Sequence, residues 1–245
     1  MRVTPLAFAL ALSIAASASA QEWDQYVSTQ DGFKVDFPGQ PKITETTWKS
    51  EYGYMLPARV YTVDKGKEHY SMTVVNYNGI EKQGFERQAK CPPGAETCQG
   101  QRNVGAGNTI GPSYSIQDIR GALIYASFQF FKRDATIDHY LYNWEDLVEG
   151  HEIHMTNRAD GSRTMAFIAM RENRLYILEG TVPKGYPEPG LFYQSLGWVD
   201  KDGNGIRYQY IYVNEVYGLG LYPEPPHGQG GQFQGGGAAA APPQR

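Results

Sequence analysis

The stretch 58–74, ARVYTVDKGKEHYSMTV, decides the fold class. Apolar and polar side chains alternate on both sides of Lys65 and Gly66, as expected for two half-buried strands joined by a tight turn. Two more strands are predicted upstream, over 33–37, where FKVDF alternates in the same way, and over the Thr-rich residues 43–48. Four short strands with turns between them predict an antiparallel meander.

A helix is predicted next, over 116–130. Five apolar side chains recur there at steps of three and four residues, which places them on one stripe suited to packing in a core. They are Ile116, Ile119, Leu123, Ala126 and Phe130. Ser115 and Asp118 have the spacing of a capping box, with Asp in the position that is usually Glu.

Strands return after this helix. They are predicted over 139–147, 151–157, 164–170, 175–182 and 206–213, with a short helix that begins at Pro189 and ends at Gly197. Because the strands come in runs and the helices are few, the predicted fold class is α+β, with an antiparallel sheet flanked by helices.

Several longer stretches resemble a known family. DGFKVDFPGQPKI at 31–43, ADGSRTMAFI at 159–168, NRLYILEGTVP at 173–183 and FYQSLGWV at 192–199 are similar to exported bacterial members of the PsbP-like superfamily. The resemblance covers roughly residues 22–213. It implies an α/β/α sandwich and an accessory or binding role, since the known members are mostly not enzymes.

The two ends of the chain predict its compartment and its domain limits. Residues 1–20 have the features of a signal peptide: Arg2, an apolar run over 6–16 and small residues before Gln21. The apolar run is too short to cross a bilayer, so we expect a periplasmic or secreted protein without an integral membrane segment. Residues 21–222 are predicted to form a single domain. The tail 223–245, rich in Pro, Gly, Gln and Ala, is predicted to be disordered.

The charge of the chain limits its partners. The sequence has 22 Lys and Arg against 26 Asp and Glu, for a formal net charge of −4. A mildly acidic chain with interspersed charges has no basic patch for nucleic acid. It also lacks the Lys/Arg cluster that holds anionic lipid.

Cys91 and Cys98 are the only cysteines, in the stretch CPPGAETC. In an oxidising compartment a pair this close is expected to form a disulfide. A redox-active pair usually has two residues between its cysteines, and a zinc site needs four ligands at suitable spacing. The bond would staple a long irregular loop predicted over 79–114, which is either a binding element or an insertion without a binding role.

Two short patterns imitate metal sites. Asp200, Asp202 and Asn204 match the first half of a calcium loop, but its twelfth position is Ile211 where a bidentate Glu is needed. His151 and His154 lie three apart in a predicted strand, so their imidazoles should point to opposite faces. We therefore expect no metal and no cofactor.

Aromatic side chains offer the remaining candidate site. Tyr208, Tyr210 and Tyr212 would line one face of the strand predicted over 206–213. Such a row can bind sugars or peptides, or it can belong to the sheet core.

No catalytic motif is found, and no catalytic residue is assigned. The leading hypothesis is an exported, soluble, non-enzymatic accessory protein that binds an envelope protein or a surface polymer through a sheet edge or the 91–98 loop. One alternative is a secreted hydrolase whose site assembles from distant residues. Another is an envelope structural protein that uses its C-terminal tail. A pocket with converging ionisable groups would favour the hydrolase, and an exposed apolar patch would favour binding.

Overall fold

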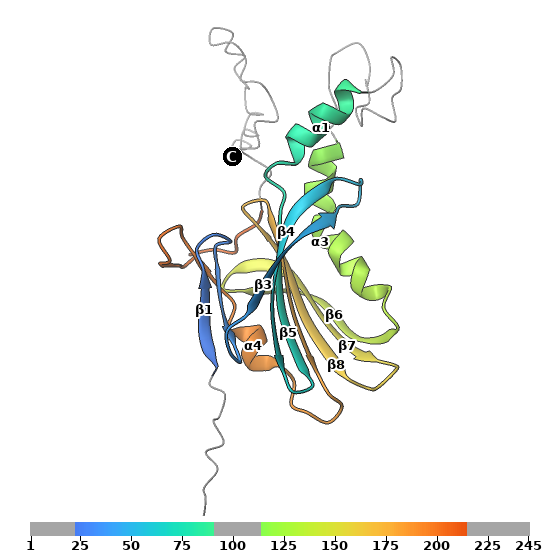
Figure 1. Cartoon of the computed structure of the whole chain (residues 1–245), viewed down its shortest axis with the longest axis vertical. Helices are drawn as coiled ribbons and strands as arrows, with labels where there is room; N and C mark the ends of the chain where they lie inside the picture. Colours follow the sequence, from blue (N-terminus) through green and yellow to red (C-terminus); the bar gives the residue numbers. More distant parts are fainter. Residues whose placement is uncertain (1–22, 91–113, 215–245) are drawn as a thin grey trace, which may run out of the picture.

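The computed structural model describes residues 23–90 and 114–214. Strands dominate this part of the chain, which holds one sheet of seven strands and one of four (Figure 1). The predicted signal peptide, the Cys91–Cys98 pair and the predicted tail lie outside the described residues.

The seven-stranded sheet is antiparallel throughout. Its strands, in spatial order, are β3 (Lys42–Lys49), β4 (Met55–Lys65), β5 (Glu68–Asn76), β9 (Arg174–Val182), β8 (Arg163–Arg171), β7 (Val148–Asn157) and β6 (Ala135–Glu145). The hairpin predicted from the stretch 58–74 is confirmed, with Tyr61 opposite Met72 across a turn in which Gly66 has a φ of 64°. The strand predicted over 43–48 pairs with it as β3, so three of the four strands of the predicted meander are neighbours. Most apolar side chains of these strands are buried on one face or the other.

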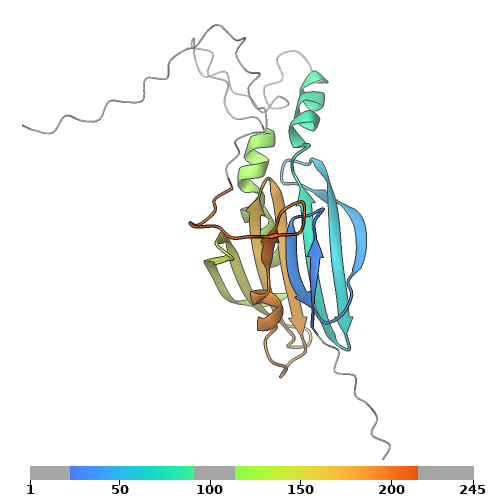
Figure 2. The ribbon, with the colours of Figure 1, turned by 90° about the vertical axis from the view of Figure 1, so that its left-hand side faces the viewer.

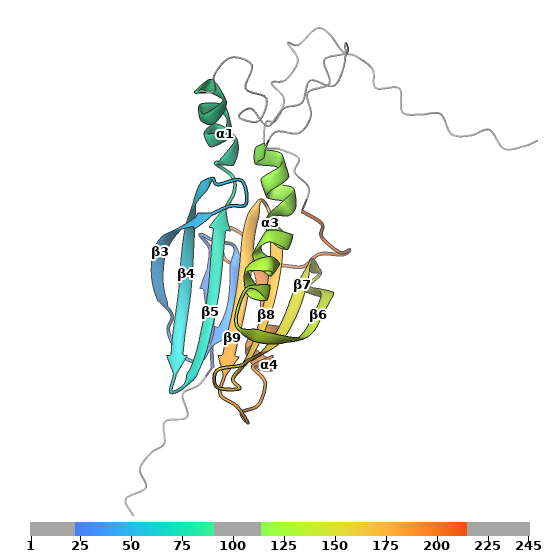
Figure 3. The same ribbon diagram turned by 90° about the vertical axis from the view of Figure 1, so that its right-hand side faces the viewer.

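Helix α3 (Tyr114–Phe131) covers one face of this sheet (Figure 3). The predicted apolar stripe packs there: Ile119, Ala126 and Phe130 lie in one buried cluster with Ile153 of β7 and Ile168 of β8. A second helix, α1 (Ile80–Ala89), lies beside the N-terminal end of α3. The sequence did not predict α1, because its apolar side chains are few.

The opposite face is covered by the four-stranded sheet (Figure 2). Its order is β1 (Asp24–Ser28), β2 (Phe33–Phe37), β10 (Gly197–Val199) and β11 (Gly205–Ile206), with the short helix α4 (Gly190–Gln194) beside it. Large aromatic side chains fill the space between the two sheets, among them Phe33, Phe37, Tyr70, Phe167, Tyr176 and Trp198.

The predicted fold class is therefore wrong. The expected α+β arrangement, an α/β/α sandwich, needs helices on both faces of the sheet. One face carries a second β-sheet instead, with only the five-residue α4 beside it, so the fold is mainly β. The strand over 33–37 is not part of the meander: it pairs with β1 and β10 in the four-stranded sheet, and the chain passes to the seven-stranded sheet over Pro38–Pro41.

Two local predictions also fail. The strand predicted over 206–213 is reduced to the end of β11 and a single bridge between Tyr212 and Val148. Asp118 does not cap the helix: it is fully buried, and its carboxylate accepts a hydrogen bond from the Ser50 hydroxyl. No described helix is long and apolar enough to cross a membrane.

Candidate functional site

The three tyrosines of the predicted binding row do not share a surface. Tyr208 and Tyr212 pack against the core between the sheets, with ring centroids 5.0 Å apart. The Tyr208 hydroxyl accepts a 2.7 Å hydrogen bond from Nε of Arg171, and the Tyr212 hydroxyl accepts one of 3.0 Å from the backbone N–H of Glu172. Only Tyr210 is exposed, at 83%. Two of the three tyrosines thus hold the end of the described chain against the sheets.

The calcium-like stretch is a polar turn. Asp200 Oδ1 accepts hydrogen bonds of 2.9 Å from the backbone N–H of both Asp202 and Asn204. Its Oδ2 accepts a third from the Asn204 side chain at 3.1 Å. The carboxylate is therefore used by its own turn. Across 23–90 and 114–214, no three His, Cys, Asp or Glu side chains lie close enough to hold a metal ion.

The two histidines of the His151-Glu152-x-His154 pattern point to opposite faces of β7, as predicted. On the α3 face, Nδ1 of His151 lies 2.8 Å from Oγ of Ser127 and 3.0 Å from the hydroxyl of Tyr140. Burial lowers the pKa of His151. On the other face, Nε2 of His154 lies 2.5 Å from Oε1 of Glu152. The two imidazoles cannot share one metal.

The main candidate site is a group of exposed apolar side chains that was not predicted from the sequence. We call it the aromatic surface. It consists of Ile124, Phe128 and Phe131 of α3 with Tyr140, Tyr142 and Trp144 of β6. Their exposed fractions run from 37% for Phe131 to 66% for Ile124, so each offers contact area to a partner.

Strand register and helix periodicity place three of these side chains on one face of β6 and three on one side of α3. Tyr140, Tyr142 and Trp144 lie two residues apart in β6, so they share one face of the sheet. Tyr142 is paired with His151, whose ring contacts α3, so that face is the one that α3 covers. The Phe131 and Tyr140 rings meet edge to face at 4.9 Å, which joins helix and strand into one surface.

The aromatic surface lies at the β6 edge of the large sheet, whose protecting features are confined to its ends: the register shift between Ile137 and His139 with Asp138 at one end, and Glu145 at the other. Natural edge strands are commonly blunted by Lys or Pro. The opposite edge, β3, follows this rule with Lys42, Glu45 and Lys49 among its eight residues. Strand β6 holds neither Lys nor Pro in its eleven residues. A strand with such an edge is suited to contact another molecule.

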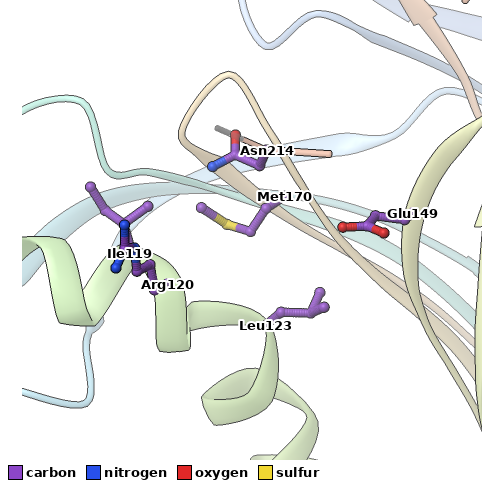
Figure 4. A pocket seen from close by; sticks show the side chains of 6 residues that line it. All are labelled: Ile119, Arg120, Leu123, Glu149, Met170 and Asn214. Carbon is purple, nitrogen blue, oxygen red and sulfur yellow. The ribbon is translucent and has the colours of Figure 1, made fainter. Parts of the chain in front are cut away.

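A small pocket adjoins the aromatic surface between α3 and the sheet (Figure 4). Its volume is about 160 Å³, and it is open to the surface. Ile119, Leu123 and Met170 give it an apolar lining, and Arg120, Glu149 and Asn214 provide the polar groups. Glu149 also accepts a 3.2 Å hydrogen bond from the Tyr142 hydroxyl, which links the pocket to the aromatic surface.

A larger polar pocket, of about 380 Å³, lies on the other side of the large sheet. Five ionisable side chains line it: Lys34, Asp36, Glu145, Asp146 and Arg207. Burial raises the pKa of Glu145 to about 7; a hydrogen bond with Tyr193 opposes the rise, and the nearby carboxylates of Glu152 and Asp146 add to it.

Glu152 lies on the same face as Glu145 but is held inside the protein. Its Oε2 accepts a 2.7 Å hydrogen bond from the Tyr193 hydroxyl and another from the Asn143 amide. Although burial favours the neutral acid, hydrogen bonds from Tyr193, His154 and Asn143 outweigh it and lower the pKa of Glu152. The pKa values of Glu145 and Glu152 are thus shifted in opposite directions, as in acid–base pairs of hydrolases.

No family model matches this chain, and no curated protein matches it significantly. The resemblance to the PsbP-like superfamily stays a sequence-based prediction, and the layer arrangement that it implied is not the one observed. The sequence did hold a signal for the aromatic surface: HYLYNWE at 139–145 places aromatic residues at alternate positions without Lys or Pro.

Proposed function

We propose that this protein is a non-enzymatic binding protein of the cell envelope that holds a protein partner on the aromatic surface. The observation that carries this proposal is the cluster of six exposed apolar side chains, contributed by both α3 and the edge strand β6. Large exposed apolar patches rimmed by polar residues mark interaction sites in soluble proteins.

The composition of the aromatic surface favours a protein partner. Tyr, Trp and Phe are enriched at protein interfaces, whereas Lys and Glu are depleted. Ile124, Phe128 and Phe131 carry no polar side-chain atom, so the α3 half of the surface has no group to bind the hydroxyls of a sugar polymer. An apolar segment of another protein suits it better.

The adjoining pocket supports the same interpretation. A pocket of about 160 Å³ with an apolar lining can take one aliphatic or aromatic side chain of the partner. Interface energy commonly concentrates in such buried anchors. Arg120 and Glu149 could then bind polar groups of the partner beside the anchor.

The expected compartment rests on residues 1–20, whose pattern predicts export. N-terminal sequencing of the mature protein tests it: a chain that begins at Gln21 supports the cell envelope as the place of action, and secreted chain that begins at Met1 contradicts cleavage.

A secreted hydrolase is the second candidate, and the polar pocket is the observation that favours it. Glu145, with its pKa raised to about 7, could donate a proton to a leaving group near neutral pH. Glu152, the natural second carboxylate, is bonded to Tyr193 and Asn143 within the protein. Hydrolysis of a glycan or ester substrate that is lost in Glu145→Gln and kept in Asp146→Asn would favour this candidate over binding.

The experiment that tests the binding function compares capture from envelope extract by three chains. They are the wild type, the Ile124→Ser/Phe128→Ser variant of the aromatic surface, and a control variant, Ile43→Ser, on the exposed β3 edge. A partner is defined as a protein retained by the wild type and the control but lost by the surface variant. Binding of the purified partner should then weaken at least about tenfold in the surface variant, since each buried apolar side chain contributes roughly 1.5–3 kcal/mol. Equal binding by all three folded chains would overturn the proposal.

A further inference from the structure

The outer edge of β6 is free to form a ladder. The strand is last in the order of the large sheet, and no strand among residues 23–90 and 114–214 pairs with its outer side. Its register with β7 shifts between Ile137 and His139 and is then unbroken from His139 to Glu145. Seven regular residues therefore offer every second N–H and C=O to a neighbour.

These seven residues, HYLYNWE, are complementary to their own sequence read backwards. When two copies run antiparallel about Tyr142, the aromatic residues oppose one another and each histidine opposes a carboxylate. The opposed pairs are Tyr142 with Tyr142, Leu141 with Asn143, Tyr140 with Trp144 and His139 with Glu145, each between one copy and the other. Aromatic pairs and pairs of a histidine with a carboxylate are favourable across strands.

We propose that two copies of this protein pair through β6, antiparallel and about a two-fold axis at Tyr142. An isologous contact of this kind uses the same patch on both subunits and needs a self-complementary strand. Ladder hydrogen bonds join the two large sheets into one continuous sheet, and the order of side chains in HYLYNWE fixes the register.

The charged pair at the ends of the ladder favours a second copy over an unrelated strand. The carboxylate of Glu145 makes no ion pair with any described residue. Glu152, Asp146 and the Tyr193 hydroxyl lie near it, and Lys34 and Arg207 line the same polar pocket. In the proposed dimer, His139 of the other copy lies opposite it and can donate a hydrogen bond to the carboxylate. Because of the two-fold axis, this contact occurs twice.

Other registers are less favourable. If the axis lay at Leu141, Glu145 would oppose the apolar Ile137, and Asp138 would oppose Trp144. The bulge between Ile137 and His139 would also fall within the ladder. Only the axis at Tyr142 uses the regular segment from His139 to Glu145 symmetrically.

Pairing would also bring the two aromatic surfaces together. Tyr140, Tyr142 and Trp144 lie on the face covered by α3. In the dimer, the aromatic residues of both copies would therefore form one continuous surface between the two α3 helices. The inference does not depend on the proposed partner: the two strands can pair whether or not the joint surface binds a further protein.

The register is tested by cysteine substitution in the full mature chain under mild oxidation. Tyr142→Cys places two cysteines opposite each other, within the 4.4–6.8 Å between Cα atoms that a disulfide spans. Leu141→Cys, the matched control, separates them diagonally by about 7–8 Å. The wild type, with Cys91 and Cys98, gives the background. Covalent dimer from Tyr142→Cys alone supports the proposal, and equal or greater cross-linking of Leu141→Cys overturns it.

The pairing itself is tested by analytical ultracentrifugation of variants at the exposed His139. His139→Glu sets two carboxylates opposite each other twice and should weaken the dimer about tenfold. His139→Lys should keep or tighten it, and Thr46→Glu on β3 should leave it unchanged. A wild-type chain that stays monomeric at high micromolar concentration overturns the proposal, as does equal weakening by His139→Lys. Loss of partner capture in Ile124→Ser/Phe128→Ser with the dimer intact would separate the two proposals.

Discussion

Replacing Asp118 by Asn should make the stability of this protein less dependent on pH. Asp118 is fully buried in α3, beneath the turn that precedes β4. Burial raises its pKa from the ordinary 3.8 to about 6, although hydrogen bonds from the Ser50 hydroxyl and from the backbone of Tyr52 and Glu51 oppose the rise. The Glu51 carboxylate nearby adds to it.

The sign and size of the effect follow from this pKa. Because the folded-state pKa of Asp118 lies above its unfolded value, folding takes up a proton between about pH 4 and pH 6. The free energy of unfolding therefore falls as the pH rises through this window and is constant above it. A shift of about two units corresponds to about 3 kcal/mol at neutral pH. Asn carries no charge at any pH and can still accept the Ser50 hydrogen bond, so Asp118→Asn removes this loss.

Urea unfolding of both chains, followed by circular dichroism from about pH 4 to about pH 8, measures the effect. The stability of Asp118→Asn relative to the wild type should be near zero at the acid end and rise by about 3 kcal/mol toward neutral pH. The contributions of all other titrating groups to the pH dependence are the same in both chains and cancel in this difference. Ile43→Ser, at an exposed position that changes no ionisable group, is the control and should give a flat difference. A flat difference for Asp118→Asn, or one that falls with pH, would refute the reasoning.

Three further substitutions test the packing and the loop. Arg171 is only 1% exposed, donates a hydrogen bond to Tyr208 at 2.7 Å and lies 5.5 Å from the centre of the Trp198 ring. Arg171→Met should therefore lower the free energy of unfolding by about 2–4 kcal/mol and the melting temperature by roughly 10 °C. An unchanged melting temperature would contradict this. Gly150→Ala would set a Cβ 2.3 Å from the carbonyl oxygen of Ile168 and should lower the free energy of unfolding, measured in urea, by about 3 kcal/mol or more. The control Gly79→Ala, whose Cβ would have no atom within 4 Å, should lower it far less. The Cys91→Ser/Cys98→Ser variant is expected to fold with stability lower by about 1–3 kcal/mol and to be cut faster by protease, and free thiols in the exported wild type would argue against the bond.

The sequence predicted most strands because alternation is a local signal. FKVDF at 33–37 has the bounds of β2, and the strands predicted over 151–157, 164–170 and 175–182 lie within β7, β8 and β9. Which layer covers each face of the sheet, however, is not determined by the local sequence of a strand. TMAFIAM in β8 is buried along its whole length, which requires cover on both faces. The pattern cannot say whether a helix or a second sheet provides that cover.

The strands that make the fold mainly β were the hardest to predict. β10 and β11 have three and two residues, too few for any periodicity. β10 pairs with β2, far away in the sequence, through Trp198 opposite Phe33. Pairing between distant segments of this length depends on the packing of the whole domain.

The candidate site was missed for a related reason. Aromatic residues at alternate positions are ordinary in a central strand, where a neighbouring layer covers them. In β6 they are exposed only because the strand lies at the edge, and that position follows from the order of seven strands. The tyrosines at 208, 210 and 212 show the converse: their alternation predicted a strand face, but the chain there makes one bridge, and two of the rings turn toward the core.

The unlike edges of the large sheet also limit how far this protein can assemble. If β6 of one copy could add to β3 of the next, the contact would repeat without closing and build an open-ended filament. Lys42, Glu45 and Lys49 make β3 a poor match for the aromatic β6, because their charges would lose water against apolar rings. If two copies pair through β6 as proposed, growth therefore stops at two copies. A protein with only one sheet edge suited to pairing can reach a high concentration without forming fibres.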